Sequence, residues 1–178
     1  MLIARTQRLV LRHLHTGDGD AMHRIFGDRE VMRFGDGTKT PEQVQLWINR
    51  WIDDLYHRWG FGMWVLVRQF DERTIGYCGL SRLPDRVGPN ETEIGFRLAR
   101  PFWGKGFASE AVAAARDYAW TELSLPKLVA FIDPSNVASI RVIEKAGFEY
   151  ERDVMLDGYD HPDRVYSVVR PVAAEGGR

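Results

Sequence analysis

The sequence predicts a mixed α/β fold, in which helices flank one largely antiparallel sheet. Its 178 residues suit a single domain with its own core. The pattern along the chain is a strand, a helical stretch, three strands, and then helix, strand, helix and two strands. A long helix at 106–122 joins two of these strands, as in one parallel crossover. We expect residues 1–172 to form the domain and residues 173–178 to be a disordered tail.

The first elements are a strand and a short helix. Residues 9–14, Leu-Val-Leu-Arg-His-Leu, alternate and are strongly apolar, which predicts a strand. Residues 17–27 carry apolar side chains on one side of a helical pattern, and a further turn is expected around 28–34.

A longer helix follows. The run 40–43, Thr-Pro-Glu-Gln, predicts its start, because threonine caps, proline fits the first turn and glutamine completes a capping box. Apolar and aromatic residues recur at helical spacing over 44–59, and Gly60 ends the pattern. We expect this aromatic face in the core; the alternative is that a rim residue, Trp47 or Trp51, lines a substrate groove.

The rest of the chain alternates between strands and helices. Glycine after the last helix, at Gly147, suits a C-terminal cap. The expected strands are 62–69, 73–82, 91–98, 127–132, 148–155 and 164–170, and the expected helices are 106–122 and 136–146.

Composition excludes several classes of protein. A net charge of −1 argues against a general nucleic-acid binder. The single cysteine, Cys78, lies among apolar strand residues and is expected to be a buried small hydrophobe rather than a reactive thiol. The histidines show no metal-ligand spacing, so we expect no metal. Without an apolar run of membrane-spanning length or a signal peptide, a cytoplasmic location is expected.

One of three Gly-x-Gly pairs has the context of an anion site. The pairs at 17–19 and 35–37 hold a central aspartate and are typical of turns. The pair at 104–106 lies between a strand and a helix, where glycine lets the backbone approach a ligand. The helix start adds unpaired N–H groups and a positive dipole end, which favours phosphate. The alternative is a helix-entry turn without a ligand.

Three motifs together resemble the GCN5-related N-acetyltransferase (GNAT) superfamily, in the branch that acetylates ribosomal-protein N-termini and related amines. They are TQRLVLR at 6–12, EIGF at 93–96 with WGKGFASEA at 103–111, and the segment from Asn136 to Phe148. The resemblance implies a sheet splayed open between 91–98 and 127–132. It also implies acetyl-CoA as co-substrate in the opening and an amine acceptor.

The resemblance places the coenzyme along the chain. N–H groups at 104–109 hold the pyrophosphate, and the pantetheine arm pairs like a strand with the backbone near Phe96 and Leu98. Asn136 is expected to hold the pantetheine and Ser139 to donate to the sulfur, although both also suit a helix cap. The expected coenzyme contacts are Phe96, Leu98, Trp103, Gly104, Lys105, Gly106, Phe107, Ala108, Ser109, Asn136 and Ser139. Trp103 stands where relatives commonly carry Gln or Arg.

The implied reaction is direct attack of a neutral amine on the thioester in a ternary complex. Glu93 is the expected base, acting through a water, and Glu91 lies on the same strand face and is the alternative. A backbone N–H around Phe96 or Arg97 is the expected oxyanion donor. Many relatives carry a tyrosine acid where this chain has Ile143. A thiol of pKa about 8.5 leaves without a strong acid, so Ser139 is the remaining catalytic candidate.

The acceptor stays open between a peptide N-terminus and a small-molecule amine. Its groove is expected between the first helices, the turn at 84–90 and the loop at 156–163, where Asp157 and Asp160 attract a cation. A monomer or homodimer is expected, with neither nucleic acid nor membrane as partner. The alternative function is an acyl-CoA-binding sensor or scaffold without strong catalysis. Nucleotide phosphotransfer lacks its motifs here.

Overall fold

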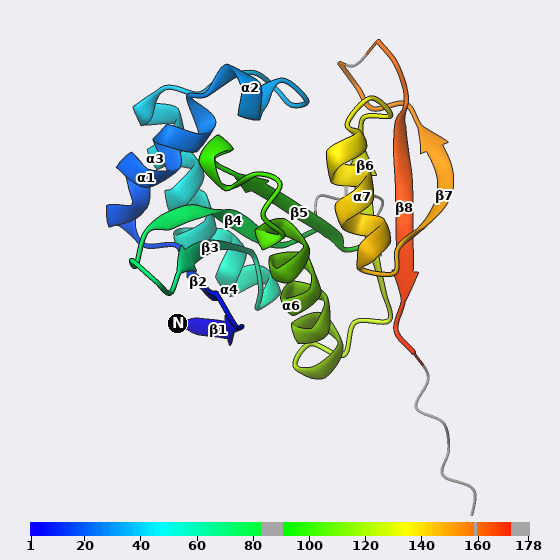
Figure 1. Ribbon diagram of the computed structural model, residues 1–178, viewed down its shortest axis with the longest axis horizontal. Coiled ribbons are helices and arrows are strands. Elements are labelled where there is room, and N and C mark those ends of the chain that lie inside the picture. Colours follow the sequence, from blue (N-terminus) through cyan, green and yellow to red (C-terminus); the bar gives the residue numbers. More distant parts are fainter. Residues whose placement is uncertain (83–90, 159, 172–178) are drawn as a thin grey trace, which may run out of the picture.

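A single twisted sheet organises the computed structural model, which describes residues 1–82, 91–158 and 160–171 (Figure 1). Its strand order is β1-β2-β3-β4-β5-β6-β8-β7, and the only parallel neighbours in this order are β5 and β6. The strands are β1 (Leu2–Arg5), β2 (Leu9–His13), β3 (Met63–Arg68), β4 (Thr74–Ser81), β5 (Glu93–Leu98), β6 (Lys127–Ile132), β7 (Glu149–Val154) and β8 (Asp163–Val169).

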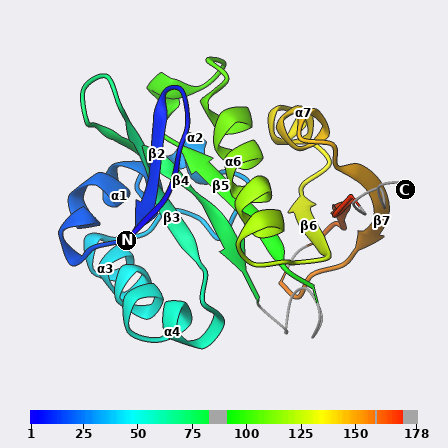
Figure 2. The same cartoon turned by 90° about the horizontal axis from the view of Figure 1, so that it is seen from below.

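Helices cover both faces of the sheet, as Figure 2 shows for α1, α3 and α4 on one side and α6 and α7 on the other. The helical segments are η1 (Thr16–Asp18), α1 (Gly19–Phe26), α2 (Arg29–Met32), α3 (Pro41–Arg50), the π-helical turn η2 (Trp51–Leu55), α4 (Tyr56–Trp59), η3 (Arg100–Phe102), α6 (Phe107–Thr121) and α7 (Val137–Lys145). We call the two sides the α3 face and the α6 face.

Each face has its own hydrophobic core. On the α6 face, Ile94 and Leu98 of β5 pack in one cluster with Ala111 of α6. On the α3 face, Met63 and Tyr77 pack in a second cluster with helical residues from α1 to η2. Because strand residues alternate between faces, Glu93, Gly95 and Arg97 of β5 lie on the α3 face.

The mixed, mostly antiparallel sheet is confirmed, and so is its opening. β5 and β6 have a single register pair, Glu93 with Val129, supported by the Val129 N–H donating to Thr92 O at 3.0 Å. From there β5 stays paired with β4 up to Leu98, while β6 stays paired with β8. The two parallel strands therefore separate toward their carboxyl ends, as they do in Figure 1.

Local sequence explains the helix boundaries. Thr40 Oγ1 accepts from the Gln43 N–H at 3.3 Å, and Gln43 Oε1 accepts from the Thr40 N–H at 2.9 Å, which is the predicted capping box. Gly60 ends α4 with φ +74°, and Gly147 follows α7 with φ +85°. Both are left-handed conformations that glycine adopts without strain.

Two elements differ from the sequence-based expectation. β1 was not predicted, because it is a four-residue edge strand with exposed ends and too little apolar pattern to be recognised. The helix expected over 44–59 contains the π-helical turn η2, which a helical apolar spacing does not distinguish from a continuous α-helix. The turn at 84–90 and the tail at 173–178 lie outside the described residues. Among the described helices, none has both the length and the apolar character needed to cross a membrane.

Candidate active site

The glycine loop between η3 and α6 has the backbone of an anion site. Gly104 and Gly106 have φ of +69° and +80°, and Gly106 is the N-cap of α6. The first backbone bond of the helix runs from the Glu110 N–H to Gly106 O at 3.1 Å, and no side chain caps the helix. The N–H groups of residues 107–109 are therefore left as donors at the positive end of the helix dipole.

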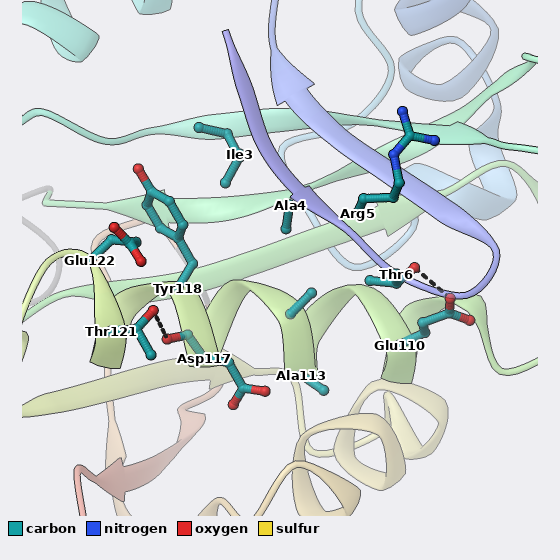
Figure 3. A pocket seen from close by; sticks show the side chains of 11 residues that line it. Ile3, Ala4, Arg5, Thr6, Glu110, Ala113, Asp117, Tyr118, Thr121 and Glu122 are labelled. Carbon is teal, nitrogen blue, oxygen red and sulfur yellow. Dashed lines mark hydrogen bonds between the residues drawn. The ribbon is translucent and has the colours of Figure 1, made fainter.

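The first-strand motif anchors this loop. Arg8 Nη1 donates to Lys105 O at 2.9 Å, and Arg8 Nε pairs with Glu110 Oε2 at 2.6 Å. Thr6 Oγ1 donates to Glu110 Oε1 at 2.5 Å, as Figure 3 shows beside the hollow of about 510 Å³ between β1 and α6. Burial alone would raise the pKa of Glu110, but the hydrogen bonds from Thr6 and Arg8 outweigh it and lower the pKa. Glu110 is thus an anchor that sequence reasoning missed.

Two side chains of the loop brace it from within. Trp103 Nε1 donates to Leu98 O at 2.7 Å, and Lys105 Nζ donates to Pro101 O at 2.8 Å. Trp103 therefore ties the loop to the end of β5, which gives this departure from the family pattern a structural role. Neither contact uses the N–H groups of the loop, so the donors predicted to hold pyrophosphate stay available.

The free edge of β5 suits an added strand. The Ala99 N–H donates to Ile75 O at 2.9 Å, which fixes the alternation of the β4–β5 ladder. By that alternation Phe96 and Leu98 turn their backbone groups away from β4, toward the opening beside β6. Leu98 O already accepts a hydrogen bond from Trp103 Nε1. A pantetheine arm could therefore pair with the Leu98 N–H and with the N–H and C=O of Phe96.

The start of α7 combines two of the predicted residues. Asn136 Oδ1 accepts from the Ser139 N–H at 3.2 Å, so Asn136 caps the helix, and both residues are half-buried. The capping role is confirmed, while contact with coenzyme stays a prediction for both. Ile143 is fully buried in the α6-face core, so its position offers hydrocarbon packing rather than an acid.

Glu93 lies at the point where β5 and β6 last pair. It stands between Ser81 of β4 and Val129 of β6, and Ser81 Oγ donates to Glu93 Oε2 at 3.3 Å. Glu91 is engaged differently, because its carboxylate meets Arg152 Nη2 at 3.1 Å and Lys127 Nζ at 3.6 Å. Of the two candidate bases, Glu93 lies at the opening between β5 and β6. Glu91 forms ion pairs that connect it to β6 and β7, as a structural residue would.

Two further sequence expectations can be placed. Cys78 is fully buried, and burial raises the pKa of its thiol well above the ordinary value, which suits an inert core residue. Within residues 1–82, 91–158 and 160–171, no three His, Cys, Asp or Glu side chains come together as a metal site.

A histidine fastens the β7–β8 connection to the end of β6. His161 Nε2 lies 3.0 Å from Asp133 Oδ2, and Nδ1 lies 2.6 Å from Asp160 Oδ1. Hydrogen bonds with Asp160 and Asp133 raise the pKa of His161. The pKa of Asp133 is lowered, because bonds from Ser135 and His161 outweigh the opposing effect of burial.

This contact is expected to depend on pH. A histidine with a raised pKa in the folded state contributes stability at low pH, and the contribution is lost as pH rises through that pKa. Proton NMR titration should give His161 a pKa above about 6.5, and Asp133→Asn should lower it. An unshifted His161 in the wild-type protein would contradict this contact.

Comparison with known proteins decides the family. A family model described as an acetyltransferase (GNAT) domain matches residues 8–149. The chain belongs to the GNAT acetyltransferase family. It is an acetyl-CoA-dependent N-acetyltransferase, as the resemblance implied, and the comparisons favour the enzyme over a sensor domain.

Three proteins illustrate the relationship. The uncharacterized N-acetyltransferase p20 of Bacillus licheniformis is 32% identical over 152 residues, which are 82% of each chain. A GNAT-family acetyltransferase from Bacillus anthracis has a TM-score of 0.80 and 25% identity, covering 95% of this chain and 98% of that one. RimL, a ribosomal L7/L12 α-N-protein acetyltransferase solved with coenzyme A, has a TM-score of 0.78 and 19% identity, covering 96% and 98%. At that identity RimL shows the shared fold.

Proposed function

We propose that this acetyltransferase moves the acetyl group directly from acetyl-CoA to a primary amine, with both substrates bound together. The observation that carries the proposal is the position of Glu93 at the last β5–β6 pair, beside the outward backbone groups of Phe96 and Leu98. A thioester held along that edge and an amine arriving from the α3 face would meet there.

The glycine loop supports the coenzyme side of the proposal. The donors at 107–109 and the positive end of α6 suit the diphosphate, and Arg8 keeps the loop in place through Lys105 O. RimL, which shares the fold, was solved with coenzyme A. Asn136 and Ser139, at the start of α7, are proposed to meet the pantetheine and the sulfur.

Chemically, the amine nitrogen bonds to the acetyl carbon while its proton passes through a water to Glu93. The carbon–sulfur bond then breaks, and the thiolate leaves with a hydrogen bond from the Ser139 hydroxyl. A backbone N–H near Phe96 is proposed to stabilise the oxyanion. A free α-amine titrates near about 8 and a lysine amine near about 10.4, so an α-amine needs less help from the base.

Acetyl-CoA binding is tested first by thermal unfolding. At about 100-fold excess over the dissociation constant, the ligand stabilises the folded protein by about 2.7 kcal/mol. For a chain of this length that raises the melting temperature by roughly 5–10 °C. Adenosine, which lacks the diphosphate and the pantetheine, serves as the control. No shift with millimolar acetyl-CoA would overturn the proposal.

Turnover is tested by thiol release across amines. Peptides with free N-termini, lysine, a polyamine and an aminoglycoside are offered in parallel, and mass spectrometry identifies the acetylated product. We expect release that depends on the amine. Hydrolysis of acetyl-CoA at the same rate with and without every amine would contradict direct transfer.

A further inference from the structure

Arg97 is a charged side chain that no carboxylate of the described residues meets in an ion pair. It lies on the α3 face of β5, four residues beyond Glu93 and on the same side. The residue is half-buried, and Nη1 of its guanidinium lies 2.6 Å from Met32 Sδ. A thioether is a weak acceptor for a group with five N–H donors. Among the described residues, Arg97 forms no ion pair.

The loop after α2 covers this guanidinium without forming an ion pair with it. A Cβ built at Gly35 would lie 2.3 Å from Arg97 Nη2 and 3.1 Å from Cζ, so the backbone of the loop passes directly over the charge. The carboxylate of the same loop, Asp36, pairs with Lys39 Nζ at 3.3 Å. Burial alone would raise the pKa of Asp36, but Lys39, helped by the charge of Arg97, lowers that pKa, although Arg97 and Asp36 form no ion pair. Holding a cation in a partly buried place without an anion is unfavourable. A ligand carboxylate would give the guanidinium a charge-assisted hydrogen bond.

Tyr77 adds a second donor beside Arg97. The two residues are register partners on β4 and β5, so their side chains are neighbours on the α3 face. The Tyr77 ring is buried, with its centroid 5.4 Å from that of Phe26 and 5.3 Å from that of Trp47. The Tyr77 hydroxyl has no hydrogen-bond partner among the described residues. It also does not belong to the polar side-chain atoms that are both fully enclosed and unpaired.

We propose that Arg97 and Tyr77 form a carboxylate-binding subsite for the acceptor, so that the preferred substrate is an amine that also carries a carboxylate. The inference rests on the proposed function, because it assumes that the amine reacts beside Glu93. Arg97 lies four positions after Glu93 along β5, or about 13 Å between their Cα atoms. Since both side chains point to the same face, an amine and a carboxylate several bonds apart span the two sites.

The test compares acceptors that differ only in charge. One pair is 6-aminohexanoate and 6-aminohexanamide, and the other is trialanine and its C-terminal amide. We expect the wild-type enzyme to favour each carboxylate by roughly 10- to 100-fold in kcat/KM, as for a charge-assisted hydrogen-bonded pair. Most of the difference should appear in KM, because the subsite binds rather than reacts.

Variants assign the preference to the subsite. Arg97→Met keeps an unbranched apolar stem and removes the guanidinium charge, so the ratio within each pair should fall to near one. Tyr77→Phe keeps the packed ring and should lower the ratio by a smaller factor. Arg50→Met, which removes an exposed arginine from the end of α3, should leave the ratio as in the wild type. A retained melting shift with acetyl-CoA confirms that each variant is folded.

The outcomes separate this inference from the proposed function. Equal rates within each pair, or a preference that survives Arg97→Met, would overturn the carboxylate subsite while leaving the acetyltransferase proposal intact. Acetylation of other amines but of neither pair would do the same. Thiol release that no amine accelerates would remove the proposed function, and the subsite with it.

Discussion

Replacing Gly106 by valine is expected to weaken acetyl-CoA binding by roughly 100-fold. Gly106 has φ +80° at the N-cap of α6, and a residue with a Cβ pays roughly 1–2 kcal/mol in that conformation. A β-branched side chain is worse still, so the loop should shift to relieve the strain. The N–H groups at 107–109 would then no longer point to one diphosphate position.

Crowding of Arg8 adds to that strain. A Cβ at Gly106 would lie 3.3 Å from Arg8 Nη2, and the same guanidinium holds Lys105 O and Glu110. Displacing it would loosen the anchor between the first strand and the loop. The dissociation constant of coenzyme A, measured by calorimetry, should therefore rise in Gly106→Val and rise less in Gly106→Ala.

Gly60→Val is the matched control. Gly60 has φ +74°, nothing within 4 Å of an added Cβ, and a place at the end of α4, away from the glycine loop. The same backbone strain should lower its melting temperature without changing the affinity for coenzyme A. If Gly106→Val bound coenzyme A as well as the wild type, the loop could not be the diphosphate site.

Local patterns carried most of what the sequence predicted correctly. The capping box at Thr40, the left-handed Gly60 and the strand–glycine–helix order at 104–106 each depend on residues close together in the chain. The alternation of apolar and polar residues likewise located the strands, because a half-buried strand has a two-residue period in its sequence. The opening between β5 and β6 needed the family resemblance, since no local pattern specifies where two strands separate.

Contacts between distant residues explain what the sequence could not predict. Glu110 meets Arg8 across 102 positions, so its anchoring role was invisible even though both residues belong to recognised motifs. Glu91 and Glu93 share a strand pattern in the sequence, and their environments differ because Glu91 pairs with Lys127 of β6 and Arg152 of β7. Arg97 looks like an ordinary strand arginine until Gly35 is found over its guanidinium.

Glu93→Gln is expected to lower kcat by roughly 100-fold or more while leaving the affinity for acetyl-CoA nearly unchanged. Glutamine keeps the size of the side chain and an oxygen for the Ser81 hydroxyl, which donates to Glu93 Oε2 at 3.3 Å. What it loses is the ability to take the proton of the attacking amine. Steady-state kinetics and calorimetry on the same preparation separate these two effects.

Glu91→Gln is the matched control for the base assignment. It removes the carboxylate that meets Lys127 and Arg152, so it should reduce thermal stability more than it reduces turnover. A larger loss of kcat in Glu91→Gln than in Glu93→Gln would reverse the roles of the two carboxylates.

The acceptor provides an independent check on the chemistry of Glu93. If the carboxylate removes a proton, the variant should recover part of its rate as pH rises, because the neutral amine then forms in solution. The recovery should occur near pH 8 for an α-amine and at higher pH for a lysine amine, whose pKa is about 10.4. A purely structural role would produce the same loss at every pH, whichever amine is used. The dependence on acceptor pKa therefore distinguishes a Glu93 that acts as a base, at the last β5–β6 pair, from a Glu93 that only stabilises the sheet.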